Sequence, residues 1–280
     1  MLLAVAAFSV MDVCLKTLSP HYPPMQVTAL RGLSSLPLIT AWALLDGGPA
    51  QLLRVRWPLH LLRGALSIVM LSAFVYALRS LPLAEAYSLF FVGPLMITAL
   101  AAVVLHERVH WRGWTAIAIG FAGMLIVLRP TGTGMLTLAG LAVVVAAAAY
   151  AISAVVVRVL GRSDTTQAMT FWVLALTCVF AGALAWREWR PIVDGDWGVL
   201  AVLGIAGALG QYAITDAFQR ADASRVAPLD YTALVWGVAF DYFLWHTLPD
   251  AMTLIGAAVI VASGLYLIRH ERVHVEAEHP

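Results

Sequence analysis

The chain has 280 residues, of which 61% are hydrophobic and only 12% are charged, and its formal net charge at pH 7 is +1. Soluble domains contain about 25% charged and 45–50% apolar residues, so a water-soluble fold of this length is excluded. The near-zero net charge and the lack of a basic patch argue against a nucleic-acid partner. The composition therefore predicts a polytopic membrane protein whose solvent is the lipid bilayer.

A helix needs about 20 mainly apolar residues to cross a bilayer. The first such segment is interpreted as a membrane helix rather than a signal peptide, because no basic residue precedes it and Asp12 and Lys16 interrupt it. Long apolar runs favour helices over barrel strands, which alternate in polarity over about 10 residues. The predicted fold class is all-α, with ten spans at 2–18, 25–45, 59–79, 82–105, 111–129, 137–160, 166–186, 197–218, 226–246 and 251–269.

An internal repeat is visible when the chain is displaced by 140 residues. This displacement aligns Tyr76–Ala86 with Asp216–Val226, His106 with His246, and Arg129 with Arg269. A unit of five helices is odd, so the second copy enters the membrane from the opposite side, as in many secondary transporters. The predicted organisation is a first five-helix repeat at 1–130, an inverted second repeat at 137–270 and a cytoplasmic tail at 271–280.

Arginine and lysine in short loops predict the orientation, because cytoplasmic loops carry an excess of them. With the N-terminus in the cytoplasm, the inner side holds Arg54, Arg56, Arg108, Arg112, Arg158, Arg162, Arg220, Arg225, Arg269 and Arg272. The outer side holds Arg79, Arg129, Arg187 and Arg190, with Lys16 near the end of the first span. We therefore expect both termini on the cytoplasmic side of the cell (inner) membrane.

Two stretches resemble the EamA-type branch of the drug/metabolite transporter superfamily. They are "YALRSLPLAEAYSLFFVGPLMITALAAVVLHERVHWRGWTAIAIGFAGMLIVLRP" and "APLDYTALVWGVAFDYFLWHTLPDAMTLIGAAVIVASGLYLIRH". The family pattern is a small-residue helix ending in Glu, a short turn and a Gly-rich final helix; Glu107 fits it, whereas Thr247 departs from it in the second half. The resemblance implies a ten-helix bundle, a central cavity lined mainly by helices 1, 3, 4, 6, 8 and 9, and transport without ATP or a prosthetic group.

Charged residues inside the spans are costly, about 2.5–3.5 kcal/mol at mid-helix, so each needs a partner or a wet cavity. Asp12 and Lys16, spaced i, i+4, either neutralise each other or leave Asp12 to bind a cation or a proton. Glu85 is either a first-turn anion favoured by the helix dipole or a vestibule carboxylate. Gly93 and Pro94 follow it, and because Pro94 removes the hydrogen bond to residue 90, we expect a kink that serves gating.

Two arginines and the ninth span have alternative interpretations. Arg31 and Arg63 are expected to snorkel to the interfaces, or Arg31 to pair with a carboxylate. Asp230 is a first-turn anion or a cavity group, and Asp241, three turns on, can share its face. The candidate substrate-binding residues are Asp12, Lys16, Tyr76, Glu85, Tyr87, Phe90, Tyr150, Gln211, Tyr212, Asp216, Asp230, Tyr231 and Trp236, with Gly93 and Pro94 for gating.

These residues predict a secondary transporter of small polar or amphipathic metabolites, namely amino acids or related zwitterions and cations, with export as the expected direction. An uptake carrier or facilitator of the same fold is the alternative. A channel is less favoured, and so is an intramembrane enzyme, because no mid-span His is available to activate a serine. We expect no metal and no cofactor; proton coupling and facilitated diffusion both stay open, as do the oligomeric state and the identity of the substrate.

Overall fold

The structure is a computed structural model and describes residues 1–46, 48–53, 55–104, 111–128, 138–220 and 227–277. Within these ranges every regular element is a helix. In chain order they are α1 (Leu2–Leu18), α2 (Pro24–Asp46), α3 (Ala50–Leu53), α4 (Trp57–Leu78), α5 (Leu83–Phe90), α6 (Val92–Val104), α7 (Trp111–Leu128), α8 (Leu138–Leu160), α9 (Thr166–Ala185), η1 (Trp186–Glu188), η2 (Asp194–Asp196), α10 (Trp197–Arg220), η3 (Ala227–Thr232), α12 (Ala233–Trp245) and α13 (Ala251–Ala277).

Length and composition identify the solvent of this bundle. Among the described residues, six helical stretches are long and apolar enough to cross a membrane: Pro24–Asp46, Trp57–Leu78, Leu83–Val104, Leu138–Leu160, Thr166–Glu188 and Asp194–Arg220. In water, so much apolar surface would be exposed that the chain could not remain a soluble monomer. The chain is therefore a polytopic, all-helical membrane protein.

The fourth predicted span is interrupted in the middle. Helix α5 ends at Phe90 and α6 begins at Val92, just before the Gly93–Pro94 pair. Pro94 has no N–H to donate to the carbonyl of residue 90, so the helical ladder cannot continue through this point. The interruption lies where the sequence predicts a kink, and its role in gating stays a prediction.

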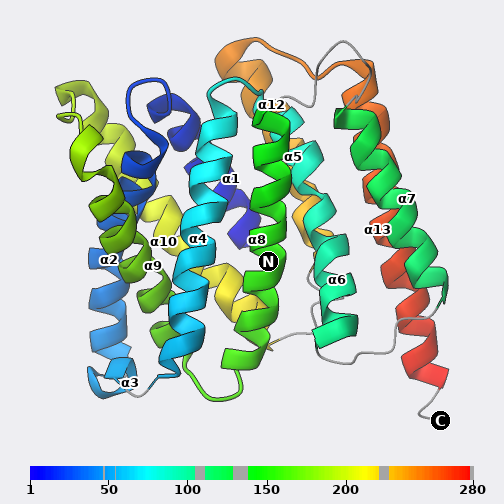
Figure 1. Cartoon of the computed structure of the whole chain (residues 1–280), viewed down its shortest axis with the longest axis horizontal. Coiled ribbons are helices and arrows are strands. Elements are labelled where there is room, and N and C mark those ends of the chain that lie inside the picture. Colours follow the sequence, from blue (N-terminus) through cyan, green and yellow to red (C-terminus); the bar gives the residue numbers. More distant parts are fainter. Residues whose placement is uncertain (47, 54, 105–110, 129–137, 221–226, 278–280) are drawn as a thin grey trace.

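Neighbouring helices come from the two halves of the chain (Figure 1). Helices α2 and α9 lie together at one side of the bundle, and α7 and α13 at the other. Between them, α4 packs on α8, and α1 packs on α10. Small residues allow these close approaches; a Cβ at Gly123 of α7 would lie only 2.9 Å from Ile260 of α13. The core is therefore built between the halves rather than within each.

Candidate functional site

The middle of the bundle contains a cavity of about 160 Å³. Most of its walls come from α1, α4, the α5–α6 segment, α8, α10 and the η3–α12 segment, which correspond to the six spans that the family resemblance implies. Arg31 of α2 and Val173 of α9 complete the lining. The aromatic part of the lining comprises Phe8, Phe74, Tyr87, Phe90, Phe91, Tyr150 and Phe218.

One buried carboxylate–tyrosine pair joins α1 and α5. The Tyr87 hydroxyl of α5 donates a hydrogen bond of 2.7 Å to Oδ2 of Asp12 on α1. Asp12 is 7% exposed, and both residues line the cavity. The ring of Tyr87 lies against Gly237 of α12, where an added Cβ would come within 2.6 Å of the ring. The absence of a side chain at Gly237 therefore fixes where Tyr87 can lie.

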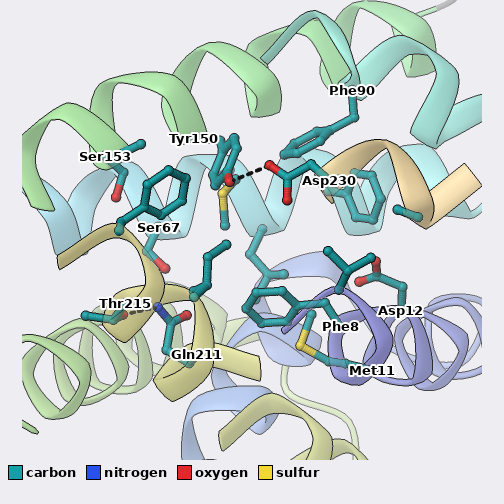
Figure 2. Close-up of a pocket in the computed structure, with 18 of the residues that line it drawn as sticks. Phe8, Met11, Asp12, Ser67, Phe90, Tyr150, Ser153, Gln211, Thr215 and Asp230 are labelled. Carbon is teal, nitrogen blue, oxygen red and sulfur yellow. Dashed lines mark hydrogen bonds between the residues drawn. The ribbon is translucent and has the colours of Figure 1, made fainter. Parts of the chain in front are cut away.

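A second pair joins α8 and η3, and Figure 2 shows it across the upper part of the cavity. The Tyr150 hydroxyl of α8 donates to Oδ2 of Asp230 in η3, over 3.0 Å. Here too the tyrosine ring packs on a glycine, because a Cβ at Gly93 would lie 3.3 Å from Tyr150. Each half of the chain thus supplies one aspartate and one tyrosine. In the first half the aspartate comes first in the chain, and in the second half the tyrosine comes first.

The opposite wall of the cavity is basic. Arg31 donates from Nη2 to Gln211 Oε1 at 2.9 Å, and Gln211 Nε2 lies 3.4 Å from Thr215 Oγ1. Arg63 of α4 donates from Nη2 to the same hydroxyl at 3.2 Å and from Nη1 to the carbonyl of Met169 at 2.8 Å. We call these four linked side chains, Arg31, Gln211, Thr215 and Arg63, the basic ladder.

The expectation that Arg31 and Arg63 snorkel to the interfaces is wrong. Arg31 is 1% exposed and Arg63 is 3% exposed, and both line the cavity. They remain in the core because α10 supplies polar acceptors at two positions one turn apart, Gln211 and Thr215, on one face. Each guanidinium still has one buried nitrogen that donates to no acceptor in the described part of the chain, namely Nη1 of Arg31 and Nε of Arg63.

An ion pair closes the bundle at its upper end in Figure 1, where α1 ends and α5 begins. Lys16 Nζ lies 2.8 Å from Oδ1 of Asp241, and 4.3 Å from the centre of the Trp245 ring. The second oxygen of Asp241 accepts the backbone N–H of Ala84 at 2.7 Å, so it caps the N-terminus of α5. Lys16 therefore pairs with Asp241 instead of forming the i, i+4 pair with Asp12, which leaves Asp12 to the cavity.

A different buried cluster lies at the lower end, where α4 begins and α8 ends. Asp164 accepts hydrogen bonds from Ser163 Oγ at 2.6 Å and from the backbone N–H of Arg56 at 3.2 Å, and its Oδ2 lies 2.8 Å from His60 Nε2. Burial raises the pKa of the Asp164 carboxyl, but the hydrogen bonds from Ser163, His60 and Arg56 outweigh it and hold this pKa below its usual 3.8. This cluster does not line the cavity.

The structure separates the candidate residues into two groups. Those that line the cavity are Asp12, Tyr87, Phe90, Pro94, Tyr150, Gln211 and Asp230. Those that do not are Lys16, Tyr76, Glu85, Gly93, Tyr212, Asp216, Tyr231 and Trp236. In the second group, Glu85 lies in the first turn of α5, Asp216 binds Arg220 at 2.6 Å, and Trp236 is 41% exposed.

Two aromatic members of the second group pack against other aromatic rings. Tyr212 packs against Trp42, with ring centres 4.6 Å apart, and Tyr231 packs edge-on against Phe91 at 5.2 Å. Tyr76 is 37% exposed. The sequence reasoning missed Arg31, Arg63 and Thr215 as cavity groups. The i, i+4 spacing of Gln211 and Thr215 was the available signal, but it does not identify which arginines face them.

The cavity contains charged groups of both signs. Among the described residues, no group of three or more His, Cys, Asp or Glu side chains could hold a metal ion. Carboxylates on one wall and guanidinium groups on another instead suit a molecule that carries charges of both signs. A charged cavity enclosed by membrane helices defines the class of protein as a membrane transporter.

The comparison with protein families agrees with this class. The model of the EamA-like transporter family matches residues 1–129 and again residues 137–269. The chain belongs to the EamA-like transporter family, whose characterised relatives are transporters and not enzymes. A solved crystal structure, at 21% identity, aligns with a TM-score of 0.70 over 94% of this chain and 93% of that chain, which supports the fold alone.

Several curated relatives are named for the small metabolites they move. The pseudopaline exporter CntI of Pseudomonas aeruginosa PAO1 is 27% identical over 97% of this chain and 96% of the relative. The S-adenosylmethionine uptake transporter of Rickettsia prowazekii is 26% identical over 99% and 94%. The riboflavin transporter of Vibrio cholerae is 31% identical over 76% and 72%. The chain is therefore similar to both exporters and uptake carriers.

Proposed function

We propose that the protein is a secondary carrier for small polar or amphipathic metabolites, namely amino acids or related zwitterions and cations, in the cell's inner membrane. The observation that carries this proposal is the central cavity that Asp12, Asp230 and Arg31 all line. Charged groups at membrane depth are retained where they bind a substrate or an ion. Aromatic side chains between them, such as Phe8 and Phe90, suit the apolar part of an amphipathic molecule.

The ten spans are proposed to form two inverted five-helix halves, residues 1–130 and 137–270, followed by the tail 271–280. The two stretches matched by the family model support this division. So does the packing, because the neighbours α4 and α8 (third and sixth spans) would map by a two-fold axis onto α10 and α1 (eighth and first spans), which are also neighbours. Inverted halves can exchange conformations and thereby expose one site to either side.

Alternating access needs a contact that breaks at each end. At the upper end we assign this role to the junction of Lys16, Asp241 and the Ala84 N–H, which ties α1, α12 and α5 together. The interruption at Gly93–Pro94 is the hinge about which α5 moves. With both termini in the cytoplasm, as the loop arginines predict, the upper end faces the outside of the cell.

Flux through liposomes tests the proposal. Purified protein should exchange a radiolabelled substrate across the membrane without ATP and with saturation, which distinguishes a carrier from a channel. Asp12→Asn should lose at least about tenfold in flux, because it removes a charge that faces the cavity. Glu85→Ala is the matched control, since Glu85 does not line the cavity. Equal flux in both variants would refute the site, and unsaturable flux would refute the carrier mechanism.

The direction is proposed to be export, and uptake is the alternative that the S-adenosylmethionine relative represents. Inverted and right-side-out vesicles separate the two, because an exporter accumulates substrate only in inverted vesicles. An imposed proton gradient is the second arm. If the gradient drives accumulation, the carrier is proton-coupled; if substrate only equilibrates, it is a facilitator.

A further inference from the structure

Two buried arginines in the cavity form no direct ion pair in the described part of the chain, although Asp12 is near enough to Arg31 to attract it electrostatically. Arg31 uses Nε for the sulfur of Met11 at 3.1 Å and Nη2 for the neutral amide oxygen of Gln211 at 2.9 Å. Arg63 uses its Nη groups for a backbone carbonyl and for the hydroxyl of Thr215. A buried guanidinium normally pairs with a carboxylate or a phosphate, because neutral acceptors compensate its lost hydration poorly.

The unused donors belong to these same side chains. Nη1 of Arg31 and Nε of Arg63 have no acceptor among the described residues, although both side chains are almost fully buried. A buried donor without an acceptor is costly, and in a native structure it needs an explanation such as a missing ligand. Both donors belong to residues that line one cavity, so one class of ligand can explain both.

Two members of the basic ladder, Gln211 and Thr215, lie apart from Asp12, whereas Arg31 reaches toward it, with Nε on the Met11 sulfur and the guanidinium 5.9 Å from the centre of the Phe8 ring. Figure 2 shows Gln211 and Thr215 on one side of the cavity and Asp12 on the other, with Phe8 and Met11 toward Asp12. Asp12 and Asp230 each receive a tyrosine hydroxyl and no arginine, so the acidic and basic groups of the cavity do not neutralise each other by contact. The two walls therefore remain available to opposite charges on one molecule.

We propose that the basic ladder is the subsite that binds the carboxylate of the transported molecule, with Arg31 and Arg63 supplying the donors. The inference rests on the proposed function and narrows its substrate class: cations that lack an acidic group are excluded, and zwitterions with a carboxylate are selected. The amino group of such a zwitterion would bind at the Asp12 or Asp230 wall.

The test compares amino acids with the amines that lack only the carboxylate. L-histidine and histamine, L-tyrosine and tyramine, and L-phenylalanine and phenethylamine are measured for binding to the full chain in detergent and for liposome flux. We expect wild type to prefer at least one acid over its amine by about tenfold or more, the ratio expected for one charge-assisted hydrogen bond. Arg31→Gln should bring this ratio close to one without weakening amine binding.

Gln211→Glu guards against a variant that merely unfolds. Glutamate has the same shape as glutamine. Its carboxylate would pair with Arg31, which should stabilise the fold and at the same time occupy the subsite. We expect a raised melting temperature together with loss of amino-acid binding. Arg56→Gln is the matched control, because it removes an exposed arginine outside the cavity. It should change neither the acid-to-amine ratio nor the melting temperature.

The outcomes separate the two proposals. If wild type binds and transports each amine as well as its amino acid, the proposal of a carboxylate subsite is wrong, whereas the proposal of a carrier still holds. Retention of the tenfold preference in both Arg31→Gln and Gln211→Glu would also overturn the carboxylate subsite. If chloride stabilises the protein through Arg31 and no amino acid competes with it, an inorganic anion occupies the ladder and the inference is wrong. Failure of every probe to bind or move would remove both this inference and the proposed substrate class.

Discussion

Two aspartates that line the cavity, Asp12 and Asp230, differ from two at the ends of the bundle, Asp241 and Asp164. Within the described residues, Asp12 and Asp230 each have one hydrogen-bond donor, a tyrosine hydroxyl. Asp241 has an ammonium group and a backbone N–H, and Asp164 has a hydroxyl, an imidazole and a backbone N–H. A carboxylate can accept about four hydrogen bonds. The cavity pair therefore keeps capacity for a ligand, whereas the end pair is used by the fold.

The largest effect on stability is expected from Asp241→Ala. This change leaves Lys16 without its counter-ion and the Ala84 N–H without an acceptor, and loss of one partner from a buried ion pair costs about 3–5 kcal/mol. The free energy of unfolding in detergent should fall by about this amount. Asp216→Ala breaks the exposed pair with Arg220 and should cost only about 0.3–0.5 kcal/mol. Equal losses would mean that Asp241 is not a structural carboxylate.

Asp12→Asn and Asp230→Asn should reduce flux strongly while changing stability little, unlike Asp241→Ala. Asparagine keeps the shape and can still accept the tyrosine hydroxyl, so the melting temperature should change little. Flux should nevertheless fall at least about tenfold, because the charge that faces the cavity is lost. Thermal unfolding and liposome flux on the same preparations check both parts, and a large fall in melting temperature without a specific loss of flux would put these residues with Asp241.

The two tyrosine–aspartate pairs should differ in how well they tolerate crowding. Gly237→Ala places a Cβ 2.6 Å from the Tyr87 ring, so the ring must shift away from residue 237 and its hydrogen bond to Asp12 is disturbed; such overpacking costs about 1–3 kcal/mol. Gly93→Ala meets Tyr150 at 3.3 Å and should cost less. The measurement is unfolding free energy. Gly198→Ala, with nothing within 4 Å, is the control and should stabilise α10 slightly.

The smallest effect concerns pH and Asp164. Its pKa in the folded state lies below 3.8, so the folded state favours the ionised form. The resulting stability is fully present above the unfolded value and is lost as the pH falls through the folded pKa. Melting temperature should therefore decline on acidification below about pH 5, and Asp164→Asn should flatten this decline. An unchanged acid limb in the variant would show that other groups cause it.

Hydrophobic run length and punctuation determined much of the fold. The predicted span 137–160 agrees with α8 (Leu138–Leu160), and 166–186 agrees with α9 (Thr166–Ala185), because both are bounded by turn residues and filled with apolar ones. The interruption near Pro94 followed from the missing N–H of proline. The end of the last helix did not follow: α13 continues to Ala277, beyond the predicted span 251–269, although its C-terminal turns are polar.

The free-energy cost of placing a charged side chain in an apolar span pointed to candidate residues for the site, but not to their partners. Asp12 and Asp230 stood out because carboxylates are rare in apolar spans, and both line the cavity. Glu85 and Trp236 stood out equally and do not line it, because the rotation of a helix about its axis depends on its neighbours. One of the two alternatives for Lys16 paired it with Asp12, four residues away in sequence, whereas its carboxylate partner lies on α12.

The sequence by itself determined the solvent, the class of fold and the family, since these depend on composition, run length and local motifs that a single chain segment carries. Only the tertiary structure decided which charges meet: Lys16 with Asp241, Tyr87 with Asp12, Tyr150 with Asp230, and Arg31 with Gln211. The physical reason is that each of these contacts joins helices far apart in the chain. Their geometry depends on how those helices pack, and no local pattern encodes it.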